Sequence, residues 1–183
     1  MKTKKLNTLI LVVLGISLSP VCHAQAEQVF EKGSLTVSAG IGLGNEYKSE
    51  YSNSALGIKA VAETGLWQAG PGIVSLGVEV GNSFSSNGSL PNYRASSLVV
   101  AGRSAWHHGW NIKGLDTYAG LSAGAGFNQY RYEKNGTVRQ TEIVPVFGGF
   151  VGASYFISPS FGFNVEAGYD ITQIQGGIVF KLR

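Results

Sequence analysis

The sequence has little cysteine, no surplus of charge after its first residues, and no hydrophobic run long enough to cross a membrane as a helix. Its single cysteine, Cys22, lies in the first 26 residues, so the remaining chain cannot form a disulfide. The formal net charge of +3 comes from Lys2, Lys4 and Lys5, because residues 27–183 hold 11 basic and 11 acidic side chains. This balance excludes the clustered positive charge of a nucleic-acid-binding surface, so we expect no nucleic-acid partner.

The first 26 residues have the features of a secretory signal peptide. Three lysines precede an apolar run over residues 9–18, and the small residues Ala24 and Ala26 form a cleavage site. The run is too short for a membrane-spanning helix. A retained anchor helix and a lipid-modified Cys22 are the alternatives, although residues 19–21 do not fit the usual lipoprotein pattern. The sequence therefore predicts an exported chain, with a signal peptide over residues 1–26 and one domain over residues 27–183.

The exported part is rich in glycine and alternates between apolar and polar side chains with a period of two, which is typical of β-strands. The alternation predicts eight strands, at residues 35–43, 56–63, 74–81, 96–106, 117–128, 142–156, 161–170 and 173–182. A membrane-crossing strand needs about 9–11 residues, and bacterial barrels have an even strand count. The sequence therefore predicts an all-β fold: an eight-stranded antiparallel up-and-down transmembrane β-barrel.

Charged side chains fall on the less apolar face of these strands. They are Lys59, Glu63, Glu79, Arg103, Glu166, Asp170 and Lys181. The lumen of an eight-stranded barrel is just wide enough to be filled by side chains, so these groups must pair or carry water. We expect a polar plug of paired charges and not an open channel.

Two strands leave questions about their faces. In the strand at 96–106 only Arg103 sets the inward face, and in the strand at 142–156 either face could be outward. In the strand at 117–128, the face that carries Gly120, Gly124 and Gly126 predicts a place where large side chains from elsewhere fit.

Aromatic side chains gather at the expected turns and loops between strands. They are Trp67, Trp106 and Trp110 at one end, and Tyr47, Tyr51, Tyr93, Tyr130 and Tyr132 at the other. Two membrane interfaces would select such girdles, although aromatic rings could also simply cap the ends of any barrel. The loops at the tyrosine end, residues 45–54, 85–94 and 131–141, are expected to face outside, and Asn135 followed by Gly136 predicts a hairpin.

The C-terminal strand resembles the signal by which outer-membrane β-barrels are recognised by their assembly machinery. The matching residues are Gln175, Gly177, Phe180 and Leu182, although the family usually ends on an aromatic residue and this chain continues to Arg183. With the order of features over residues 161–182, the chain resembles the small OmpA/OmpX-like outer-membrane barrels of Gram-negative bacteria. The resemblance implies a barrel with both ends in the periplasm, with outer-membrane lipid and the barrel-assembly machinery as partners. We expect a monomer whose last strand pairs with its first.

The family resemblance implies no single function, because its members include adhesins, membrane-integrity proteins, lipid A-modifying enzymes and small-molecule conduits. His107 and His108 are expected in a periplasmic turn, which is the wrong end for lipid A chemistry. We therefore predict no catalytic residue, cofactor or metal site, and a structural or surface-interaction role with a possible extracellular ligand. The alternatives are a narrow porin-like conduit, a lipid A-modifying enzyme, and a soluble exported barrel that binds a ligand in a greasy interior.

Overall fold

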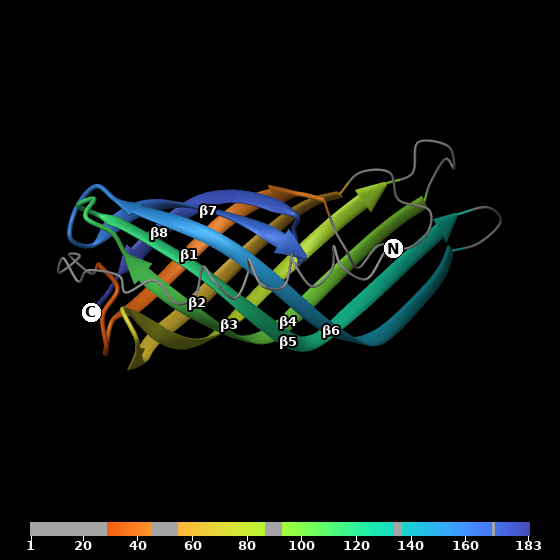
Figure 1. Cartoon of the computed structure of the whole chain (residues 1–183). Helices are drawn as coiled ribbons and strands as arrows, with labels where there is room; N and C mark the ends of the chain where they lie inside the picture. The colour runs from red at the N-terminus through yellow and green to blue at the C-terminus, as the bar shows by residue number, and fades with distance from the viewer. Residues whose placement is uncertain (1–28, 45–54, 87–92, 134–136, 170) are drawn as a thin grey trace, which may run out of the picture.

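The computed structural model describes residues 29–44, 55–86, 93–133, 137–169 and 171–183, which form one closed antiparallel β-barrel (Figure 1). The strands follow one another around the wall in chain order, which confirms the predicted up-and-down barrel. The described residues include no helix that could cross a membrane. The strands are β1 Leu35–Leu43, β2 Ala55–Ala69, β3 Gly72–Ser86, β4 Tyr93–Gly109, β5 Leu115–Glu133, β6 Thr137–Phe156, β7 Phe161–Tyr169 and β8 Ile174–Lys181.

The C-terminal strand β8 closes the barrel against β1, as the sequence predicts. The antiparallel register sets Val37 opposite Phe180. Just past the ladder, the backbone N–H of Leu182 donates to the carbonyl oxygen of Leu35 at 2.8 Å. Because this closure pairs the backbone groups that an open sheet would leave bare, β1 and β8 are not edge strands.

The barrel wall is apolar outside and polar inside, which is the reverse of most water-soluble proteins. Large side chains such as Ile41, Leu121 and Val165 are 61–71% exposed, whereas charged side chains such as Lys59 and Glu79 are buried. The alternative of a soluble barrel with a polar exterior and an apolar interior does not fit this wall.

The two uncertain strand faces are resolved by how large and small side chains fit together. In β4, Arg103 faces inward together with Val99 and Ala101, as predicted. In β6, Phe150 faces inward while Phe147 faces outward. A Cβ atom on Gly120 would lie 2.5 Å from Cζ of Phe150, so the small residue on β5 leaves the space that the phenyl ring fills. The prediction that large side chains pack against the glycine face of β5 is therefore confirmed at Gly120, where the ring of Phe150 packs.

Strands β2 to β6 are longer than the sequence predicts. The gap between the strands predicted at 56–63 and 74–81 is reduced to residues 70 and 71, because β2 continues past an irregularity between Gly65 and Trp67. The expected loops at 85–94 and 131–141 shrink to 87–92 and 134–136, while the loop at 45–54 lies outside the described residues. Backbone pairing continues there although the side chains no longer alternate in polarity, so the period of two gave no signal.

The unequal strand lengths leave one uncovered strand edge. β6 pairs with β7 only over residues 149–156, whereas it pairs with β5 over residues 137–155. Figure 1 shows β4, β5 and β6 reaching well beyond the end of β7. In the described part of the chain no strand pairs with the far edge of residues 137–148, and Pro145 lies in the middle of it. Proline lacks the N–H that an added strand would need, so it protects this edge.

Replacing this proline tests the protection. Pro145→Val restores a donor on the uncovered edge and is expected to shift the purified protein in detergent micelles from monomer toward dimers or larger species, measured by light scattering after size-exclusion chromatography. Ala153→Val is the control, because Ala153 lies on the same strand where both neighbours pair with it. An unchanged monomer for Pro145→Val would contradict the role given to Pro145.

The seam gives a second prediction. Phe180 faces outward, opposite Val37 and 5.1 Å from the ring of Phe161, so Phe180→Asp places a charge on the apolar wall and is expected to abolish membrane assembly. Lys181→Gln on the inner face should fold and lose only local stability. The yield of folded, heat-modifiable protein on gels measures both variants, and equal damage from the two would refute the face assignment.

Candidate functional site

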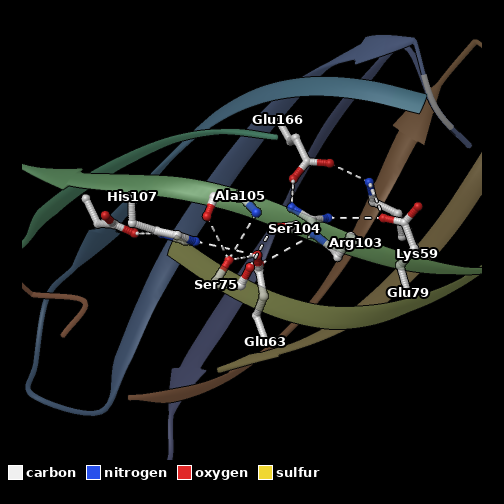
Figure 2. Close-up of polar contacts among 10 residues, drawn as sticks. Lys59, Glu63, Ser75, Glu79, Arg103, Ser104, Ala105, His107 and Glu166 are labelled. Carbon is white, nitrogen blue, oxygen red and sulfur yellow. Dashed lines mark hydrogen bonds and ion pairs between the residues drawn. The ribbon is translucent and has the colours of Figure 1, made fainter. Parts of the chain in front are cut away.

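Charged side chains from four strands converge at one level of the lumen. β2 supplies Lys59 and Glu63, β3 supplies Glu79, β4 supplies Arg103, and β7 supplies Glu166. Each occupies an inward-facing position of its strand, so the strand period carries it inside. Figure 2 shows these side chains pointing toward one another across the barrel. Five of the seven sequence-predicted lumen charges are therefore brought together.

We call these five charged side chains the lumen network, and Arg103 lies at its centre. Its two terminal nitrogens bind Glu79 at 3.2 Å and Glu166 at 3.0 Å. Its Nε lies 3.5 Å from Glu63, and the guanidinium lies 3.8 Å from the centroid of the Phe150 ring. One side chain thus joins β4 to β2, β3 and β7, and its apolar face packs on β6. Arginine suits this position because its planar fork reaches several carboxylates at once.

Lys59 supplies the second positive charge of the lumen network. Its Nζ donates to Glu166 and lies 3.8 Å from Glu79. Two cations are therefore shared among three carboxylates, and all five side chains are buried. A buried charge is costly unless it is paired and hydrogen bonded, so the members of the network depend on one another.

His107 extends the lumen network toward one end of the barrel, and its position corrects the sequence interpretation. The turn expected at His107 and His108 begins only after Gly109, because β4 continues to that residue and turns the ring of His107 inward. Its Nδ1 lies 2.8 Å from Asp116 on β5, and its Nε2 lies 3.5 Å from Glu63. His108 faces the opposite way and stacks on Trp106, with ring centroids 5.4 Å apart.

The sequence interpretation missed Asp116, Ser75 and His107 as lumen residues, although a signal was present. Asp116 precedes the inward residue Tyr118 by two positions, and His107 follows the inward Ala105 by two. Extending each period of two by one step would have found both. Ser75, which lies on the inward face of β3, donates to Glu63 at 2.6 Å.

Two predicted lumen residues do not join the lumen network. Lys181 is half-buried on the inner face of β8, but its Nζ donates to the carbonyl oxygen of Val29 at 2.7 Å and contacts no carboxylate among the interactions of the described residues. The expectation that Lys181 pairs with the buried acids is therefore wrong. The segment before β1 folds back against the barrel end and supplies the carbonyl oxygen of Val29 as the acceptor. Asp170 lies outside the described residues.

Both ends of the lumen network are closed by apolar side chains. At one end the buried ring of Phe30 stacks on His107, with centroids 3.9 Å apart. At the other end Ile171, between β7 and β8, packs with Val99, Ala101 and Val146 in a buried cluster. The segment that carries Phe30 is tied to the wall, since the N–H of Gly33 donates to the carbonyl oxygen of Gly65 at 2.8 Å. The charged groups are thus enclosed.

Most of the remaining predicted residues lie on the outer wall or outside the described residues. Trp67 and Trp106 lie within strands and not in turns, while Trp110 follows β4, and all three are exposed. Tyr47 and Tyr51 lie outside the described residues, and Tyr93, Tyr130 and Tyr132 lie in strand ends whose side chains are not described. In the C-terminal stretch Gln175 faces inward, Phe180 and Leu182 are exposed, and Gly177 lies between β1 and β7.

The enclosed groups are arranged to bind one another and not a large substrate. Ser75, His107 and Asp116 are side-chain types found in hydrolase triads, but the hydroxyl of Ser75 donates to Glu63 and is fully buried. No group of three or more histidine, cysteine, aspartate or glutamate side chains in the described ranges could hold a metal ion. The geometry supports a structural role for the lumen network.

Loss of the central cation tests this role. Arg103→Met leaves three carboxylates facing one buried lysine, so the free energy of unfolding should fall by about 3–5 kcal/mol in urea titrations followed by tryptophan fluorescence. Adding Glu166→Gln should recover part of the loss, because it removes one uncompensated charge. Gly102→Ala, whose new Cβ would meet only the Ala123 carbonyl oxygen at 3.9 Å, is the control and should change little. An unfolding curve for Arg103→Met that matches the unchanged protein would refute the role of the network.

Comparison with solved structures finds similar chains at low sequence identity. No protein-family model matches the chain, and no curated protein matches it. Among solved structures, Ail of Yersinia pestis in complex with the heparin analogue sucrose octasulfate is 12% identical with a TM-score of 0.46, covering 82% of this chain and 96% of Ail. The N-terminal β-barrel domain of Pseudomonas aeruginosa OprF is 14% identical with a TM-score of 0.44, covering 82% and 98%. Neisserial surface protein A is 14% identical with a TM-score of 0.35, covering 81% and 92%.

Proposed function

We propose that the chain is an integral outer-membrane β-barrel protein of the small OmpA/OmpX-like kind, non-enzymatic, with a structural and surface-contact role and a closed lumen. The observation that carries the proposal is the inverted wall, in which large apolar side chains such as Leu121 face outward while charges such as Arg103 face inward. A water-soluble protein rarely exposes an apolar patch of more than a few hundred Å², and here the apolar surface surrounds the barrel. An apolar surface that surrounds the barrel is compatible with the hydrocarbon of a lipid bilayer.

The uncovered edge of β6 indicates how deeply the barrel would lie in the bilayer. Bare backbone groups are not tolerated in hydrocarbon, so residues 137–148 belong outside it. The hydrocarbon would then surround residues 149–156 of β6, where β7 covers the edge of the strand. The ends of β4, β5 and β6 that extend beyond β7 would project from the membrane and form the surface-contact region.

The lumen supports a plugged barrel over a conduit. Arg103 and its carboxylates fill the cross-section, and the apolar residues Phe30 and Ile171 close both ends. An ion would have to break paired charges and displace an apolar seal to pass.

Lysine substitutions on the wall test the membrane location. Leu121→Lys places a charge in the apolar belt of β5 and should lower the free energy of unfolding in lipid vesicles by about 2–4 kcal/mol. Ile112→Lys, in the turn after β4, is the matched control and should cost about 0–1 kcal/mol, since it lies at the barrel end. Recovery of the exported protein in the soluble periplasm, or equal effects of the two lysines, would contradict the proposal.

Conductance measurements test the closed lumen. The purified barrel in planar bilayers should show no steady single-channel current, because the paired charges leave no continuous water path. Arg103→Met combined with Phe30→Gly removes the central cation and one seal, and is expected to raise the frequency of current events. Steady, uniform conductance from the unchanged protein would favour the conduit alternative.

The surface-contact role is tested by shortening the β5–β6 projection. Replacing residues 130–140 by a two-residue Asn-Gly turn removes the last four pairs of the β5–β6 ladder and keeps the ladder from the Gln129–Thr141 pair onward. Bacteria that display this variant should lose attachment to host-cell matrix while keeping detergent resistance. Equal attachment by the full and shortened chains would contradict the surface-contact role, and only the structural role would remain.

A further inference from the structure

A groove lies on the outer wall of the barrel, across β8, β1, β2, β3 and β4. The hollow arises where small residues meet, because Ala39 lies opposite Ala60 and Gly176 lies opposite Ile41. Its volume of about 560 Å³ falls within the range of about 300–1,000 Å³ that is usual for small-molecule pockets. The apolar side chains that face outward along it include Ala39, Ile41, Ile58, Ala60, Leu98 and Ile178.

The polar side chain of Asn82 interrupts this apolar lining. Asn82 lies on the outward face of β3, between Ile58 and Leu98 in the register. Its Oδ1 accepts a hydrogen bond from the hydroxyl of Ser96 at 2.9 Å. Its Nδ2 carries two N–H donors, and among the described residues no protein acceptor meets them. Donors without a partner are costly against hydrocarbon, so a ligand with an acceptor oxygen suits this position.

The amide of Asn82 lies toward one end of the groove. β3 runs toward the barrel end at which β6 begins with its uncovered residues 137–148. Ala60 and Ala39 lie deeper, since Ala60 is opposite Val80, which precedes Asn82 on β3. With residues 137–148 outside the hydrocarbon, the apolar part of the groove lies within it. The amide then lies near the level at which acyl chains join their headgroups.

We propose that this groove binds one ester-linked acyl chain of a membrane lipid. The ester carbonyl oxygen accepts a hydrogen bond from Nδ2 of Asn82, and the hydrocarbon chain lies along Ala60 and Ala39. A second copy of the barrel fits the groove less well, because its wall is also convex and would rest on the rim at Ile58 and Leu98. Its backbone carbonyls are also already paired within its own sheet. This inference rests on the membrane location proposed above.

A lipid titration tests the groove. The mature chain is folded in micelles of an alkyl maltoside, a detergent without a carbonyl group, and titrated with diacyl phosphatidylcholine or with its dialkyl ether analogue. The two lipids differ only in the ester carbonyls. NMR resonances of the Asn82 side-chain amide and of the groove backbone report binding. We expect saturable shifts, with half-saturation at an about fivefold lower lipid-to-detergent ratio for the ester lipid, as one hydrogen bond would give.

Two substitutions separate the parts of the groove, with the backbone amides of Ala39 and Val80 as the common readout. Ala60→Phe fills the hollow from an exposed position and should abolish the saturable shifts. Asn82→Leu removes the donors and should abolish the preference for the ester lipid while apolar binding remains. Ala123→Phe is the matched control, because Ala123 is exposed on the outer wall of β5 and does not line the groove.

Three outcomes would overturn the proposal. The first is equal half-saturation by the two lipids in the unchanged protein. The second is a response of full size in Ala60→Phe. The third is a dimer, measured by light scattering, that Ala60→Phe dissociates, since a second copy would then fill the groove. If Ala60→Phe fails to fold, Asn82→Leu still tests the hydrogen bond.

Failure of the membrane location itself would look different. The chain would then stay folded and soluble without detergent, and Leu121→Lys would cost no more stability than Ile112→Lys. A barrel that needs the micelle but does not distinguish the two lipids would contradict only the inference about the groove.

Discussion

The contact between the guanidinium of Arg103 and three carboxylates is the interaction on which the rest of the barrel depends. It joins β4 to Glu63, Glu79 and Glu166 on three other strands, across a lumen from which bulk water is excluded. A buried pair of this kind gives weak net stability by itself, but removing one partner is costly. Its main effect is to hold the four strands in one relative position, since only one register brings all four groups together.

The shape of the wall around this contact follows from the same constraint. The Phe150 ring packs under the guanidinium, and Gly120 gives the ring its space. Phe30 and Ile171 then close the two ends with apolar surface, which keeps the charges from competing with water. A lumen filled in this way favours a structural barrel, and the functional chemistry is then left to the projecting strands and the outer surface.

The period of two in the sequence predicts a large part of the barrel, and the places where this prediction fails have a physical reason. Apolar side chains at Leu35, Val37 and Ile41 had to lie on one side of β1, and Lys59 and Glu63 on the inner side of β2, because strands alternate. The period fails where polarity no longer alternates, so the sequence predicts loops at 85–94 and 131–141 where the ends of β3 to β6 remain paired. The strand predicted at 96–106 also ended one residue before His107, although the period of two, continued past Ala105, places His107 inward.

By itself the sequence determined the strand count and the inward face of most charged residues, because both follow from local alternation. The pairing of β1 with β8 followed from the need to leave no open strand edge. Only the tertiary structure decided which charges meet. Lys181 binds a backbone carbonyl of the folded-back segment, while His107 and Asp116, nine residues apart, meet through the β4–β5 register. The inward face of β6 was also decided there, since Phe150 fits only where Gly120 lies across from it. Such matches depend on distances between strands, which no single strand contains.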